Sequence, residues 1–160
     1  MRRSDRQVND VDDIFKIIDR CDVLHLAMVD GNNLPYVVAL NFGYEREGDD
    51  LILYVHSAKE GKKIDLLKQN PNVYFEMDCG HEFVPGTTEK PCQAGYRYDS
   101  VMGSGVARFL DDFEEKSHAL NTLMQHVGRT NEIYHFPEEV VARTCVFSIR
   151  CKDFTGKHRA

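Results

Sequence analysis

A strand followed directly by a helix, within residues 51–71, is the feature that most constrains how this chain folds. Residues 51–55 are apolar and rich in β-forming side chains, which is typical of a short strand. Residues 57–60 fit the capping-box pattern that opens a helix, and Asn70 followed by Pro71 ends one. The segment therefore predicts a strand that leads straight into the start of a helix.

That helix start predicts an anion-binding site. Free N–H groups and the partial positive charge of the helix dipole point outward at a helix N-terminus. Lys62 and Lys63 add two ammonium groups there, and His56 and Ser57 lie where the strand ends. This arrangement suits a phosphate group. The alternative is that Ser57 and Glu60 only cap the helix and that both lysines are solvated.

Composition and charge exclude several classes of protein. The 160 residues are 42% apolar and 29% charged, which predicts one soluble domain spanning residues 1–160. The net charge of −6 and the lack of a basic tract argue against a nucleic-acid-binding protein. No apolar run reaches the roughly 18 residues of a membrane span, and the N-terminus lacks the apolar core of a signal peptide. We therefore expect a cytoplasmic protein.

The cysteines and histidines predict no metal site. An odd number of cysteines in a cytosolic chain argues for free thiols, here Cys21, Cys79, Cys92, Cys145 and Cys151. Cys79, His81 and Cys92 could supply zinc ligands, but no Cys-x-x-Cys pair is present and no fourth ligand is evident. His25 lies in an apolar strand with no other metal-ligand type nearby in the sequence, so we expect a packed histidine.

The order of elements predicts a mostly β fold with flanking helices. Apolar periodicity and turn residues predict six strands, over residues 23–29, 35–44, 51–55, 72–79, 98–110 and 143–154. Helices are predicted over residues 10–20, capped by Asp10, and from the capping box to Asn70, with Ile64 and Leu67 buried. A third is predicted over residues 111–127, with one helical turn at 137–141, and its apolar stripe consists of Phe113, Leu120, Leu123, Met124 and Val127. Residues 30–33 predict a turn. Residues 80–97 have the composition of a long loop. Gly103 and Gly105 indicate a bend of the barrel, with a bulge or a close approach by a flat ligand as the alternatives. Sequential antiparallel strands, beginning with a three-stranded meander, predict a small barrel decorated by helices.

Four segments together resemble the pyridoxamine 5′-phosphate oxidase-like flavin-binding split-barrel superfamily, with the nearest likeness to nitroimidazole-resistance (Nim) proteins. The segments are residues 36–44, 53–63, 96–107 and 154–157. The likeness runs over nearly the whole chain, from about residue 1 to 157. It implies a six-stranded antiparallel split β-barrel with flanking helices, which forms a homodimer and holds FMN, with FAD as the alternative flavin, at the subunit interface.

The resemblance also implies which residues contact the flavin. One strand would run along the ring through its backbone, with the residues Tyr36, Val37, Val38, Ala39, Leu40 and Asn41. His56 and Ser57 would lie beside the ribityl chain and phosphate, and Lys62 and Lys63 match the phosphate-binding Arg-Lys of relatives. Ser100 and Val101 would approach the ring from the long strand. His56 is also the candidate reactive residue, as proposed for its counterpart in Nim-like members.

A bound flavin supplies its own redox chemistry, so the chain needs no nucleophile or carboxylate pair. We therefore expect a flavin-dependent oxidoreductase that reduces small electron-poor molecules such as nitroimidazoles and other nitro compounds. Three alternatives stay open: a pyridoxamine 5′-phosphate oxidase-type B6 enzyme, a non-enzymatic flavin-binding or redox-sensing protein, and an unrelated barrel with a misleading capping box.

Overall fold

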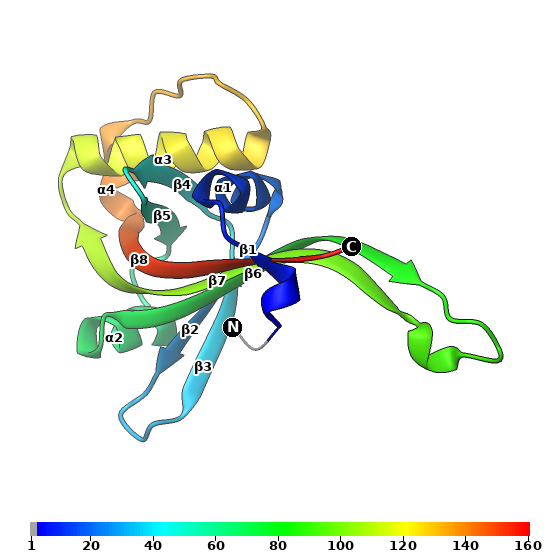
Figure 1. Cartoon of the computed structure of the whole chain (residues 1–160). Helices are drawn as coiled ribbons and strands as arrows, with labels where there is room; N and C mark the ends of the chain where they lie inside the picture. Colours follow the sequence, from blue (N-terminus) through cyan, green and yellow to red (C-terminus); the bar gives the residue numbers. More distant parts are fainter. Residues whose placement is uncertain (1–2) are drawn as a thin grey trace.

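The computed structural model describes residues 3–160 and is mostly β (Figure 1). Within these residues, eight strands form one antiparallel sheet: β1 (Gln7–Val8), β2 (Leu24–Val29), β3 (Pro35–Leu40), β4 (Gly43–Glu47), β5 (Asp50–Ser57), β6 (Asn72–Val84), β7 (Gly95–Leu110) and β8 (Cys145–Arg159). The α-helices are α1 (Val11–Arg20), α2 (Lys62–Gln69), α3 (Phe113–Gly128) and α4 (Glu138–Arg143), with short 3-10 turns at Ser4–Arg6 and Pro91–Gln93. None of the described helices is long and apolar enough to cross a membrane.

The strand order is β3-β2-β6-β7-β8-β5-β4, with β1 added alongside β8. The long strands β7 and β8 lie at the centre, and β3 and β4 form the two ends of the path. The predicted antiparallel, mostly β class with flanking helices is confirmed. The predicted count of six strands is wrong, because two further strands are present and the sheet does not close on itself among the described residues. The arrangement is consistent with a split barrel.

The core lies between the curved sheet and the helices. Helix α1 buries one face through Ile14, Phe15, Ile17 and Ile18, and the side chain of Asp10 caps it by accepting a hydrogen bond from the backbone N–H of Asp12 at 2.8 Å. The sheet contributes fully buried residues such as Phe75 and Phe147. The predicted helix over residues 10–20 and its cap are therefore confirmed.

The predicted strand over residues 35–44 is wrong in one respect. The chain leaves β3 after Leu40 and enters β4 at Gly43, and these two strands lie at opposite ends of the sheet. Strand β3 pairs with β2, and β4 pairs with β5, so the predicted three-stranded meander does not form. Phe42, in the crossing segment, is fully buried and fixes the crossing in the core.

The predicted capping box does not form. Ser57 is the last residue of β5, and its hydroxyl donates to the carbonyl of Ala58. Helix α2 begins later, at Lys62, after Gly61 at a φ of 124° and without any side-chain cap. That positive φ is a conformation that glycine adopts without strain, so Gly61 sets the start of the helix. Its buried residues Ile64 and Leu67 and its end at Asn70 agree with the prediction.

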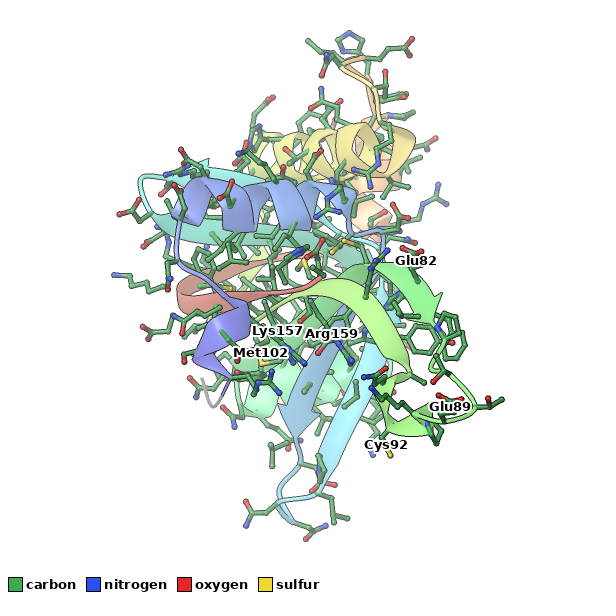
Figure 2. All side chains as sticks on the ribbon, turned by 45° about the vertical axis from the view of Figure 1, so that its right-hand side comes forward. Glu82, Glu89, Cys92, Met102, Lys157 and Arg159 are labelled. Carbon is green, nitrogen blue, oxygen red and sulfur yellow. The ribbon has the colours of Figure 1, made fainter. Side chains whose placement is uncertain are left out.

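The predicted loop over residues 80–97 is mostly a β-hairpin. Strand β6 continues to Val84 and β7 starts at Gly95, so the two strands form an arm that projects from the body (Figure 1). Glu89 and Cys92 lie near the tip of this arm (Figure 2). At the two glycines of β7, the β7–β8 register shifts between Ser104 and Val106, which agrees with the bulge that was the alternative to a bend.

The apolar stripe predicted for the third helix is partly wrong. Leu120 and Leu123 of α3 are buried as expected. Phe113, Met124 and Val127 are instead exposed, because the buried face of α3 is completed by Lys116, Ala119 and His126. These buried positions keep the three-to-four residue spacing of one helix face, rotated from the predicted one. The sequence pattern did not predict this face because two of its buried residues, Lys116 and His126, are polar.

Candidate functional site

The start of α2, the end of β5 and the start of β3 meet in one region. The ammonium group of Lys62 lies 4.6 Å from the ring centroid of Tyr36, which places the first turn of α2 against β3. His56 and Ser57 end β5 and pair with Val146 and Cys145 of β8. Segments that the sequence predicted to act together are therefore neighbours in the fold.

Positive charge is concentrated at the start of α2. No side chain caps this helix, so its first N–H groups are free to meet a ligand. Among residues 3–160, neither Lys62 nor Lys63 forms a salt bridge. Burial lowers the pKa of Lys63, an effect that the nearby Cys145 only partly opposes. Two cations without a carboxylate partner at a helix N-terminus can hold an anion.

His56 lies in the field of that charge. Partial burial of its ring, followed by the charge of Lys63, lowers the pKa of His56 below its ordinary value. The imidazole is therefore neutral at pH 7, with one nitrogen as donor and the other as acceptor. A negative ligand beside Lys63 would weaken this repulsion and favour the protonated ring.

Strand β3 offers its backbone to a ligand. It lies at the end of the sheet and, among the described residues, pairs with β2 alone, so the N–H and C=O groups of its outer edge are available. Tyr36, Val38 and Leu40 pack against the core, whereas Val37 and Ala39 are exposed on the opposite face. Asn41 is exposed just after the strand. These positions fit backbone contacts along a flat ligand.

Ser100 and Val101 lie far along β7 from the position level with His56. His56 pairs with Val146, and Val146 pairs with Leu110 of β7. Ser100 is ten residues earlier on β7, which corresponds to about 33 Å of strand. Val101 is fully buried and lies between Met77 of β6 and Gly156 of β8, so within one chain it exposes nothing to a ligand. The chain therefore does not bring all predicted flavin contacts together by itself.

A lysine-lined pocket beside α2 was missed by the sequence analysis. It has a volume of about 380 Å³, and its lining includes Lys59, Lys68, Lys116 and Cys145. Lys116 is buried, and its ammonium group donates to the carbonyl of Thr144 at 3.0 Å. Because Lys116 lies on the inner face of α3, more than forty positions after α2, sequence spacing gave no signal of this grouping.

The metal-ligand types are arranged differently from the expectation. All five cysteines are free, as predicted. Within residues 3–160, Cys79, His81 and Cys92 do not come together as a metal-ligand group. His25 was expected to be a packed histidine because no other metal-ligand type is near it in the sequence. In the fold, however, β6 places Glu76 and Asp78 beside it.

Comparisons with known proteins give both sequence and structural matches. Residues 10–158 match a family model described as pyridoxamine 5′-phosphate oxidase. No curated protein sequence matches the chain. Among solved structures, a proposed 5-nitroimidazole antibiotic resistance protein from Bacteroides thetaiotaomicron is 34% identical, with a TM-score of 0.80 over 94% of this chain and 85% of that one.

Two more distant structures share the fold. The flavocytochrome Anf3 from Azotobacter vinelandii is 20% identical, with a TM-score of 0.78 over 100% of this chain and 72% of that one. A FAD-binding protein from Mesorhizobium loti is 23% identical, with a TM-score of 0.68 over 97% of this chain and 98% of that one.

Proposed function

The chain belongs to the pyridoxamine 5′-phosphate oxidase family, and from this premise we propose that it is a flavin-dependent oxidoreductase that reduces small electron-poor molecules such as nitro compounds. The observation that carries the proposal is the uncapped start of α2, where among residues 3–160 neither Lys62 nor Lys63 forms a salt bridge and where Lys62 contacts Tyr36 of β3. A flavin needs an anion-binding site for its phosphate beside an accessible flat surface for its ring. The start of α2 is suited to the phosphate, and strand β3 is suited to the ring.

The proposed flavin lies along β3 with its phosphate on α2. The first N–H groups of α2, Lys62 and Lys63 hold the phosphate. His56 and Ser57 contact the ribityl chain, and the backbone of residues 36–41 lies along the ring. The lysine-lined pocket on the flank of α2 offers cations for the second phosphate of FAD, whereas FMN would leave that pocket free.

We further propose that the working unit is a two-fold dimer with the flavin at its interface. The separation of Ser100 from His56 supports this, because one flavin could contact both if they came from different chains. The outer face of the sheet also exposes apolar side chains that a partner could cover: Val29, Val37, Tyr74 and Val106. Two-fold dimers are the commonest oligomers.

When bound, the flavin would supply the electron transfer. The role of the chain is to position the substrate and to manage one proton. His56 enters as a neutral imidazole, because burial and Lys63 disfavour its charged form. An anion held by Lys63 offsets that repulsion, so the ring can take up a proton and donate it from nitrogen to a substrate oxygen. The similarity to a proposed nitroimidazole-resistance protein supports a nitro compound as the acceptor.

The family description also favours a second candidate, oxidation of pyridoxamine 5′-phosphate. That reaction requires basic groups for the substrate phosphate, and the end of β8 carries Lys157, His158 and Arg159 (Figure 2). Two of these are already engaged: His158 contacts the carboxylate of Asp99, and the ammonium of Lys157 lies 5.0 Å from the ring centroid of Tyr98. This engagement favours the nitro-reducing function.

One purification tests the proposal. The protein should be yellow, and mass measurement of the released cofactor distinguishes FMN from FAD. NAD(P)H with a nitroaromatic should give turnover, whereas pyridoxamine 5′-phosphate with oxygen should not. A colourless protein that fails to bind added flavin would refute the flavin site, and a flavin-loaded protein inactive with every acceptor would leave only a binding role.

A further inference from the structure

Three potential metal ligands converge on the outer face of the sheet, apart from the residues assigned to the flavin. His25 of β2 is the direct register partner of Glu76 of β6, and Asp78 is two residues further along β6 on the same face. The candidate ligand atoms of these three side chains all lie within 4.8 Å of one another. Among residues 3–160, no other group of three histidine, cysteine, aspartate or glutamate side chains is arranged this way.

The Nδ1 atom of His25 is the unusual member of this group. About half of the side chain is covered, but the Nδ1 atom itself is fully covered and has no hydrogen-bond partner among the described residues. A covered imidazole nitrogen without a partner loses its hydration without compensation. In the tautomer that carries its proton on Nε2, this nitrogen offers a lone pair that a cation can accept.

The spacing of the group suits a shared cation better than a hydrogen bond. Oε2 of Glu76 lies 3.4 Å from Nδ1, which is longer than the roughly 2.7–3.2 Å that is usual for a hydrogen bond. Two ligands of a tetrahedral zinc ion, each at about 2.1 Å from the metal, lie about 3.4 Å from each other. Asp78 places a second carboxylate next to Glu76, and a cation between them would relieve their repulsion.

His81 supplies the supporting contact that metal sites commonly have. Its Nε2 lies 2.6 Å from Oδ2 of Asp78, so the imidazole fixes the orientation of that carboxylate. Hydrogen bonds to ligand side chains are a recurring outer layer of metal sites, and their loss typically weakens metal binding by 10–100-fold. The arm that carries His81 therefore contributes to the same group.

We propose that His25, Glu76 and Asp78 bind one divalent transition-metal cation, with His81 orienting Asp78 and a fourth position left for water or a small ligand. An imidazole with two carboxylates suits zinc, iron or manganese better than magnesium or calcium, which prefer oxygen ligands alone. None of these four residues is among those proposed to hold the flavin, although the group shares the outer face of the sheet with Val37 and Tyr74. The group also lies next to β3, because Ala39 is the register partner of His25.

The test is calorimetric titration of the chelator-treated, full-length protein with zinc chloride. We expect one zinc ion per chain, binding at least 100-fold weaker in Glu76→Gln, and binding 10–100-fold weaker in His81→Gln. The control is His118→Gln, which removes another exposed histidine–carboxylate pair, 2.8 Å from Glu45, that belongs to no such cluster. This control should bind zinc as the original protein does.

Thermal unfolding with and without zinc checks that the variants are folded. Zinc should raise the unfolding temperature of the original protein and of the His118→Gln control, but not that of Glu76→Gln. Asp78→Asn replaces Glu76→Gln if the latter does not fold. The proposal is overturned if the original protein binds no stoichiometric zinc, or if both carboxylate variants bind it unchanged.

Discussion

Replacing Gly43 with alanine should push α3 away from the sheet. A Cβ atom at this position would lie 2.5 Å from the backbone nitrogen of Leu123, 2.6 Å from its Cα and 2.7 Å from the carbonyl carbon of Thr122. All three are backbone atoms of α3, so no side chain can rotate to make room. Since non-bonded carbon atoms approach to about 3.5 Å, the helix must move by about 1 Å.

The cost follows from what that movement disturbs. Leu120 and Leu123 lie on the buried face of α3, and a shift of the helix loosens the packing of their side chains. Introducing atoms into a well-packed core costs about 1–3 kcal/mol. For a domain of this size, each kcal/mol lowers the unfolding temperature by about 2–4 °C. Gly43→Ala should therefore lower it by about 2–12 °C.

Gly31→Ala is the matched control for this experiment. A Cβ atom at Gly31 meets nothing within 4 Å, so the same substitution should leave stability unchanged or raise it by less than about 1 kcal/mol. Circular dichroism during heating measures both variants, with and without added flavin, because a bound ligand raises the unfolding temperature. Equal unfolding temperatures for the two variants would show that Gly43 is not in close contact with the backbone of α3.

Further predictions concern the flavin site and the buried charges. Replacing Lys62 and Lys63 by alanine together should weaken flavin binding about 100-fold or more, since each charge-assisted contact contributes about 1.5–3 kcal/mol; Lys16→Ala, which removes an exposed lysine of α1 paired with Asp13, should bind as before in a fluorescence titration. His56→Phe should keep the flavin and lose turnover by roughly 10²-fold, the contribution of a positioned acid; unchanged turnover would reduce its role to a contact. Sedimentation of the flavin-loaded protein should show two chains, and a flavin-saturated monomer would contradict the shared site. Burial alone would raise the pKa of Asp99, but the hydrogen bonds with Arg20 and His158 lower it. The contribution of Asp99 to stability is therefore full above the unfolded pKa of about 3.9 and is lost as the pH falls through the lower folded pKa. Asp99→Asn should remove that pH dependence in denaturant titrations.

Features fixed by neighbouring residues could be predicted from the sequence. The cap at Asp10 and the turn at Asp30 form within a few positions; the carboxylate of Asp30 accepts hydrogen bonds from the backbone N–H groups of Asn32 and Leu34. Lys62 and Lys63 were also correctly predicted to lie at a helix start. The capping box of residues 57–60 that suggested this helix does not form, however. Gly61 replaces the capping box because its backbone conformation, rather than a side-chain bond, begins α2.

Features fixed by distant residues could not be predicted in this way. Where the chain breaks between β3 and β4, Gly43 packs against the backbone of Leu123, eighty positions later. The surroundings of His25 depend on the pairing of β2 with β6, and those of Lys116 depend on how α3 lies over β8. Hydrophobic periodicity reports which face of an element is buried, but not which other element covers it.

The strand order also has a consequence for biosynthesis. Among the described residues, the β4–β5 hairpin joins the sheet through β8 alone, and β8 starts about 90 residues after β5 ends. At about 5–20 residues per second, a ribosome needs roughly 4–18 seconds to make that stretch. During this interval β5 can pair with β4, but its other edge has no partner strand. Its apolar residues Leu51, Leu53 and Val55 are not yet covered by the complete sheet. The nascent chain therefore exposes an unpaired strand edge, which chaperones can bind, until residues 145–159 emerge. A chain truncated before these residues should be prone to aggregation.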